Sequence, residues 1–129
     1  MKVIKMIRLI QSRLIIPRGD TGSFTIPLQG TVEGNDTAVF YIYDPMTKES
    51  VQAIKGVIDG DIINIPFERK HTIGLSPKKY LWDIVIYKNP QYDEDDDEQI
   101  RPINGDEINS YYAAFSLPIC DIREVAQNV

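Results

Sequence analysis

The sequence is poor in the residues that form covalent cross-links and metal clusters. It has one cysteine, Cys120, and one histidine, His71, among 129 residues. A single cysteine excludes a disulfide within the chain and a cluster of thiolate ligands. We therefore expect Cys120 to be a small buried hydrophobic residue and no cofactor to be bound. A Cys–His nucleophile pair would need these two residues from different segments to meet, and nothing in the sequence supports that.

Long apolar runs and excess positive charge are also missing. No run approaches the roughly 18 apolar residues of a membrane span. The first residues, Met-Lys-Val-Ile-Lys, are similar to the start of a signal peptide, but Lys5, Arg8, Gln11 and Arg13 interrupt the apolar residues that follow. The net charge of -5 disfavours binding to phosphate backbones. We expect synthesis in the cytoplasm and neither a membrane nor a nucleic acid as partner.

Recognisable catalytic motifs are absent as well. The sequence contains no Walker loop, GxGxxG, GxSxG or HExxH pattern. His71 ends the polar run 68–71, which is typical of a protein surface. Acidic residues gather in one segment instead of lying on facing strands, as a glycoside hydrolase would require. The sequence therefore predicts that the protein is not an enzyme.

Short alternating segments separated by turn signals fill most of the chain. The turn signals recur at intervals of about ten to fifteen residues, and no long helical pattern lies between them. Asp59-Gly60 predicts a hairpin with a type I′ turn, because glycine tolerates positive φ. The length suits one domain, residues 1–129. The pattern favours an all-β, antiparallel β-sandwich of about seven or eight strands.

The segment 79–87 is the strongest strand signal. The even-numbered residues of 80–86 share one face and include Trp82, the only tryptophan, so we expect the core to be built on this strand. Asp83 lies among apolar neighbours on the other face. Either that face is the outer one, or Asp83 accepts hydrogen bonds from an adjoining loop. Tyr80 is expected to bond the crossover backbone as a tyrosine corner.

The first sixteen residues fit two structures. Their apolar residues can form the stripe of an amphipathic helix, or a first strand kinked near Gln11-Ser12. An apolar, basic segment longer than one strand can also pair with a neighbouring chain. We therefore expect residues 1–13 to be an assembly arm. Its predicted interface residues are Val3, Ile4, Met6, Ile7, Leu9 and Ile10.

Residues 93–98 form a continuous acidic block. We place this block at the tip of an extended acidic loop over residues 88–110, since six adjacent carboxylates repel one another. Asp93, Asp95 and Asp97 are weak calcium candidates, because alternate aspartates can supply oxygen ligands. The EF-hand pattern is not met, since Glu98 stands at its glycine position. No specific metal is therefore predicted.

Two segments together carry a resemblance to a known family. They are Ile-Pro-Arg-Gly-Asp-Thr-Gly-Ser-Phe-Thr-Ile at 16–26 and Lys-Tyr-Leu-Trp-Asp-Ile-Val-Ile at 79–86. Together with a closing strand at 112–118, their order resembles the immunoglobulin-like N-terminal domain of phage baseplate upper proteins and related phage virion accessory proteins. The resemblance covers most of residues 14–120. Lys79 stands where this family commonly has glycine, and the segment 88–110 is longer than a plain hairpin.

The resemblance implies an immunoglobulin-like fold and a non-enzymatic virion structural protein. Such a protein assembles in the tail or baseplate or on the capsid surface. Its partners are other virion proteins and copies of itself, so a homo-oligomer located in the virion is expected. The alternative from the residues themselves is a carbohydrate- or host-surface-binding module whose tyrosines stack on sugars. The candidate rings are Tyr41, Tyr43, Tyr87, Tyr92, Tyr111 and Tyr112.

Overall fold

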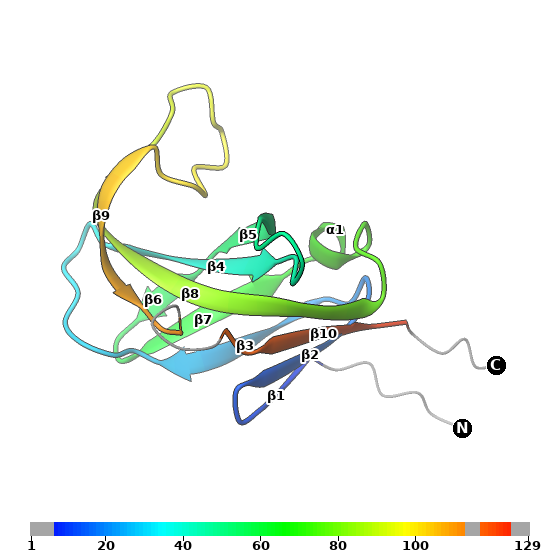
Figure 1. Cartoon of the computed structure of the whole chain (residues 1–129). Coiled ribbons are helices and arrows are strands. Elements are labelled where there is room, and N and C mark those ends of the chain that lie inside the picture. Colours follow the sequence, from blue (N-terminus) through cyan, green and yellow to red (C-terminus); the bar gives the residue numbers. More distant parts are fainter. Residues whose placement is uncertain (1–6, 113–116, 125–129) are drawn as a thin grey trace.

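The protein is a two-layer sandwich of β-sheets. The structure is a computed structural model, and it describes residues 7–112 and 117–124. Within these ranges the chain forms ten strands and one short helix, α1 (Arg69–Thr72). Two sheets pack face to face, with α1 at one end (Figure 1). The all-β class expected from the sequence is confirmed. The strand number exceeds the expected seven or eight, in part because the first strand expected over residues 1–16 is divided into β1 and β2.

The larger sheet has seven strands. Its order is β1 (Arg8–Ile10), β2 (Arg13–Pro17), β10 (Ile119–Arg123), β8 (Lys78–Gln91), β4 (Thr37–Tyr43) and β5 (Ser50–Lys55). The remaining strand, β9 (Asn104–Ser110), pairs with the far half of β8. One pair is parallel, with Cys120 of β10 opposite Leu14 of β2. The expectation of a purely antiparallel sandwich is therefore wrong at this pair. Parallel neighbours need a long connection, and here nearly the whole domain lies between β2 and β10 in the sequence.

The smaller sheet has the order β3 (Gly22–Pro27), β7 (Ile62–Phe67) and β6 (Val57–Asp59). The predicted hairpin joins β6 to β7, with Asp59 opposite Ile62. Its two central residues are Gly60 and Asp61, and only Gly60 has a positive φ, of 63°. Glycine at the first central position is typical of a type II′ turn, so the expected type I′ turn is wrong.

The strand order identifies the sandwich as immunoglobulin-like. In such domains strands C, F and G, with C′ added in variable types, form one sheet, and B, E and D belong to the other. Here β4, β8, β10 and β5 take the first set of places, and β3, β7 and β6 take the second. The hydroxyl of Tyr80 donates to the carbonyl of Ser76 at 2.9 Å, which confirms the predicted tyrosine corner.

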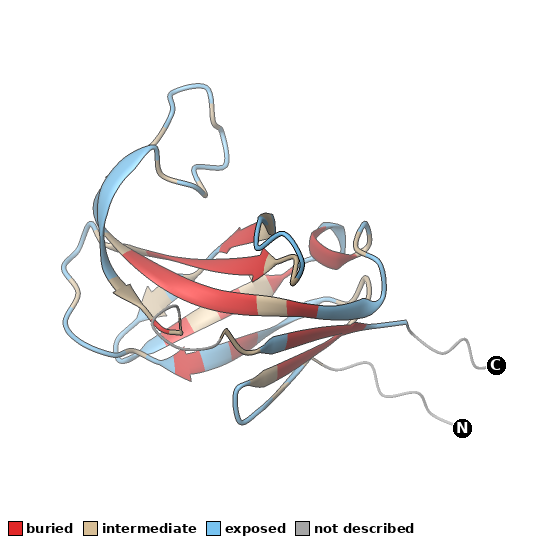
Figure 2. Ribbon diagram, in the orientation of Figure 1, coloured by how far each residue is buried: buried red, intermediate tan, exposed pale blue. Residues whose placement is uncertain are grey.

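The core lies between the sheets, and buried residues run along β4 and β8 (Figure 2). In antibody domains the residue two positions after the corner tyrosine is a cysteine of the disulfide that joins strands B and F. That position is Trp82 here, and it is fully buried. Its ring lies 5.7 Å from Phe24 on β3 and 5.6 Å from Phe40 on β4. Aromatic packing thus joins the two sheets where those domains use a disulfide.

The C-terminal third departs from the predicted boundaries. The closing strand was expected at 112–118, but β10 begins at Ile119. Residues 113–116 of that expectation lie outside the described residues. The extended loop expected at 88–110 is shorter than predicted, because β8 continues to Gln91 and β9 begins at Asn104. The irregular part of this segment is therefore 92–103.

Candidate interaction surface

The N-terminal hairpin forms one edge of the larger sheet. Ile10 pairs with Arg13, so Gln11 and Ser12 form the turn, and Gln11 has a φ of 57°. The carbonyl of Ser12 accepts a 3.0 Å hydrogen bond from the indole nitrogen of Trp82. This bond fastens the hairpin to the centre of the core. The helix alternative for this part of the chain is wrong from Arg8 onward.

The described part of the predicted arm has one face on the core and one face outward. Ile7 and Leu9 are half-buried and pack against the core, whereas Ile10 is 52% exposed. Arg8 is also exposed, and it projects from the same face as Ile10, because Leu9 between them faces Leu14 and the core. Val3, Ile4 and Met6 lie outside the described residues. Of the predicted interface residues that are described, only Ile10 thus offers a large exposed apolar surface.

Some arginines near this edge form ion pairs with carboxylates, and one does not. Asp121 accepts from Arg13 at 2.7 Å and from Arg123 at 3.2 Å. Burial alone would raise the pKa of Asp121, but these two guanidinium groups outweigh burial and lower it. Arg18 pairs with Glu124 at 3.2 Å. Among the described residues Arg8 has no such partner, so it is a cation at the sheet edge that is available to another chain.

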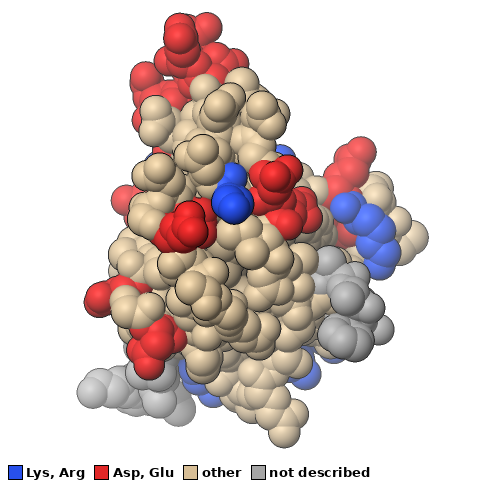
Figure 3. Space-filling model, turned by 90° about the vertical axis from the view of Figure 1, so that its left-hand side faces the viewer, with Lys and Arg blue, Asp and Glu red and all other residues tan. Residues whose placement is uncertain are grey.

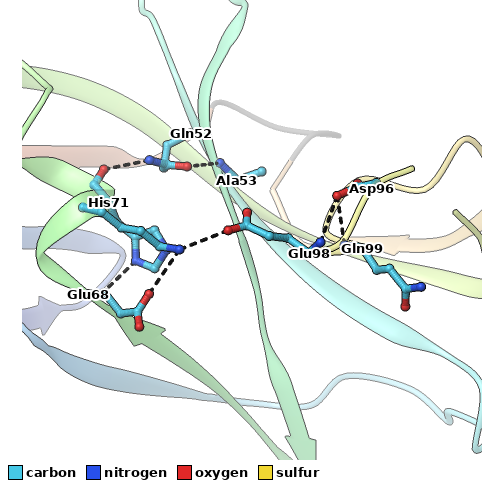
Figure 4. A network of polar contacts seen from close by, with 8 residues as sticks. Gln52, Ala53, Glu68, His71, Asp96, Glu98 and Gln99 are labelled. Carbon is cyan, nitrogen blue, oxygen red and sulfur yellow. Dashed lines mark hydrogen bonds and ion pairs between the residues drawn. The ribbon is translucent and has the colours of Figure 1, made fainter. Parts of the chain in front are cut away.

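Residues 92–103, called the acidic segment below, lie over the outer face of the larger sheet, which is the face opposite the core. The guanidinium of Arg101 lies 5.6 Å from the ring centre of Tyr41, and the ammonium of Lys55 lies 5.4 Å from that of Tyr92. Lys70 of α1 reaches Glu98 at 3.1 Å (Figure 4). Beneath this segment a second apolar cluster is formed by Val39, Tyr41, Ala53 and Val85. The segment 92–103 is thus anchored by several weak contacts.

The calcium candidates are not brought together as ligands. The carboxylate of Asp93 accepts from the backbone of Asp95 at 3.0 Å, and that of Asp96 accepts from Glu98 and Gln99 at 3.1 Å (Figure 4). These aspartates shape backbone turns. Asp95 and Asp97 point into solvent. Within residues 7–112 and 117–124 no group of three or more acidic, His or Cys side chains has the arrangement of a metal site.

His71 is a structural residue, and its expected surface position is wrong. It is 8% exposed, and its Nδ1 accepts from the backbone nitrogen of Glu68 at 2.8 Å, which caps α1 (Figure 4). Its carbonyl accepts from Gln52 at 2.9 Å. Burial lowers the pKa of His71, so the imidazole is neutral near pH 7. The capping role could not be recognised from the sequence, because the polar run 68–71 indicates a surface position.

Cys120 and Asp83 are also buried within the fold. Cys120 is fully buried, as expected, and desolvation raises the pKa of its thiol. Asp83 is 1% exposed and accepts from the Ser110 hydroxyl, from the backbone of Ile84 at 2.8 Å and from that of Tyr112 at 2.9 Å. Both sequence alternatives for Asp83 therefore hold. It lies on the face opposite the core and binds Ser110 at the end of β9 and Tyr112 just after it.

The candidate tyrosines do not form a platform for sugars. Tyr41 and Tyr111 are 8% and 7% exposed, and the other four are half-buried. The hydroxyls of Tyr41 and Tyr87 bond each other at 2.7 Å. The hydroxyl of Tyr92 bonds that of Thr37 at 3.1 Å. The hydroxyls of these three tyrosines thus form hydrogen bonds within the domain.

Strand β9 is a feature that the sequence did not predict. Its sequence, Asn-Gly-Asp-Glu-Ile-Asn-Ser, has the turn residues and charges of a loop. Glu107 pairs with Tyr87 and Asp106 with Lys88. Ile108 is its only large apolar residue, so no apolar alternation reveals the strand. The segment is extended because it pairs with the long β8.

Comparisons with protein families, with curated proteins and with solved structures found no match to this chain. The immunoglobulin-like identification of the fold therefore depends on strand order and on the tyrosine corner. No helix in the described part of the chain is long and apolar enough to cross a membrane.

Proposed function

We propose that this chain is a bacteriophage virion structural protein, an immunoglobulin-like module that assembles in the tail or baseplate or on the capsid surface. The observation that carries the proposal is the N-terminal hairpin, because β1 ends the larger sheet and has no second pairing partner among the described strands. Arg8 and Ile10 are exposed there. An open edge with an exposed apolar residue is a template for pairing with another chain.

Three residues whose side chains could take part in catalysis have structural roles instead, which fits a role in assembly. His71 caps a helix, Cys120 fills the core and Asp83 binds backbone amides. Each is thus engaged in holding the sandwich together. The resemblance of segments 16–26 and 79–86 to domains of phage virion proteins supports a place in the virion, without distinguishing head from tail.

The binding of carbohydrate or of a host surface receives no specific support. Sugar stacking needs flat, exposed rings, and the rings of Tyr41 and Tyr111 are buried. Binding of a glycan on an array, lost on substitution of the half-exposed Tyr43 by alanine, would favour that function over assembly.

The experiment that tests assembly is light scattering of the purified chain over a range of concentrations. We expect a concentration-dependent oligomer that Ile10→Asp abolishes. The matched control is Val57→Asp, because Val57 is 54% exposed and also lies on an edge strand, β6 of the other sheet. Equal effects of the two substitutions, or a strict monomer at all concentrations, would contradict the proposed contact.

A deletion experiment must respect the contacts of the hairpin. Removal of residues 2–12 would take away β1 and the Ser12 carbonyl that binds Trp82, so it would damage the fold. Deletion of 2–6 leaves the described hairpin in place. We expect this shorter deletion to remain folded and to associate more weakly. The virion location is tested by mass spectrometry of purified phage particles from the source culture. We expect this chain to be present in a fixed number of copies per particle.

A further inference from the structure

A second open edge of the larger sheet has the opposite charge to β1. Among the described strands β9 pairs only with β8, so its other edge is free. Asp106 and Glu107 lie near its start, and both are exposed. The end of the sandwich that carries β9 and the acidic segment shows many acidic and few basic side chains (Figure 3).

Charge sets β9 apart from the other open edges. β3 carries no charged residue, β5 ends in Lys55, and β6 has three residues with one carboxylate, Asp59. β9 alone among these described edges has two adjacent carboxylates, and the acidic block 93–98 precedes it in the chain. It also carries Ile108, which is 44% exposed. These are the properties that complement a basic, partly apolar strand.

The basic edge at β1 has matching properties. Arg8 and Ile10 are exposed on it, and Lys2 and Lys5 precede it in the sequence. Arg8 projects from the outer face of the sheet, opposite the face of Leu9 and Leu14. Glu107 lies on the same outer face, because it pairs with Tyr87. In a continuous sheet the two charges would therefore meet on one face.

We propose that β1 of one copy adds to the β9 edge of a second copy, so that the larger sheets of neighbouring copies become continuous. This inference rests on the proposed function and names the surface that receives the hairpin. The interaction combines main-chain hydrogen bonds with an Arg8–Glu107 pair across the strands. Exposed Ile10, on the same face as Arg8, adds apolar surface.

The main competing arrangement is a symmetric pair of β1 strands. Such a pair would bring the Arg8 side chains of two copies to the same short edge. Like charges across neighbouring strands are destabilising, so this arrangement is disfavoured. A single β1–β9 contact between two copies is heterologous and builds a ring if the rotation closes or an open filament if it does not, whereas a reciprocal pair of such contacts closes a symmetric dimer.

Charge reversal tests the pairing of these edges. We expect Arg8→Glu alone, and Asp106→Lys with Glu107→Lys, each to raise the dissociation constant by about tenfold or more. The matched control is Asp59→Lys with Asp61→Lys, which makes the same charge change at the exposed β6–β7 turn. The control should leave association unchanged, and circular dichroism confirms that every variant is folded.

Mixing the two charge-reversed variants gives the decisive result. Each is weakened alone, but the mixture again offers oppositely charged edges, so light scattering should show that assembly is restored. Weakening by Arg8→Glu without restoration in the mixture would overturn the β9 assignment. If Ile10→Asp abolishes assembly while both charge reversals have no effect, the hairpin contact stands and this inference fails. A wild-type chain that stays monomeric overturns both.

Discussion

Replacing Asp83 tests how the outer face of the sandwich is held. Asp83→Ala leaves the backbone amides of Ile84 and Tyr112 without their acceptor in a buried site. An unsatisfied buried group costs about 1–3 kcal/mol, and the Ser110 hydroxyl also loses its partner. We therefore expect a loss of about 3–5 kcal/mol in the free energy of unfolding, which is a large part of the roughly 5–15 kcal/mol typical of a domain.

The asparagine variant separates the hydrogen bonds from the charge. Both amides donate to Oδ1 of Asp83, and the Ser110 hydroxyl donates to Oδ2. An asparagine side chain at this position can keep the acceptor at Oδ1 and donate its amide to the Ser110 oxygen. We expect Asp83→Asn to cost no more than about 1.5 kcal/mol, since every partner remains satisfied.

The two chains should also differ in their pH dependence. Burial raises the pKa of Asp83, although the hydrogen bonds from Ser110, Tyr112 and Ile84 oppose that rise. A raised pKa means that the folded state binds the proton more tightly than the unfolded state. The stability of the wild type relative to Asp83→Asn is therefore fully present below the unfolded pKa, about 3.9. It decreases as pH rises through the raised folded value.

Urea titration followed by Trp82 fluorescence measures these free energies at pH values from about 3 to 7, with equal slopes m as the check on two-state unfolding. The difference between wild type and Asp83→Asn removes the contributions of the other carboxylates. A loss below about 1 kcal/mol for Asp83→Ala, or equal losses for alanine and asparagine, would refute the reasoning. A difference that grows with pH would refute the assigned pKa direction.

Three further predictions concern the corner, the thiol and the acidic segment. Tyr80→Phe should lower the free energy of unfolding by about 1 kcal/mol, because the bond to the Ser76 carbonyl is lost; an unchanged urea midpoint would contradict this role. Cys120 should react with a thiol reagent only at the rate of unfolding, since it is fully buried; fast reaction of the native chain would contradict its burial. Arg101→Ala should increase proteolysis within 92–103 while the urea midpoint moves little, because a cation–π contact to Tyr41 is lost. Lys48→Ala is the control for that experiment, and equal cleavage in both variants would show that Arg101 does not anchor the segment.

Sequence patterns predicted the parts of the fold that local burial determines. The alternation around Trp82 located β8 and its two faces, and Tyr80 located the corner, because both depend on side chains of one strand. The apolar residues of β1 and β2 allowed a helix as well as a strand. Their extended structure follows from pairing with each other and with β10, which is distant in the sequence.

The features that sequence missed depend on long-range contacts. β9 is polar, and it forms a strand because the far half of β8 offers it a partner. His71 looked like a surface residue, and only the fold brings Phe67 and Gln52 against it. Of the candidate interface, Ile10 was identified from the sequence, whereas the carboxylates of β9 were not, because charge in a polar segment does not reveal an open edge.

The parallel pairing of β2 with β10 also determines the order in which the chain can fold. Among the described strands β2 pairs with β1 and β10, and Arg13 bonds Asp121 across a separation of 108 residues. During synthesis β2 must therefore wait for β10 to leave the ribosome, while β3 to β8 already have partners for much of their length. Closing such a distant contact is slow compared with forming hairpins. The N-terminal hairpin can therefore dock in the sheet only after β10 has been synthesised, so the edge that it presents forms late in folding.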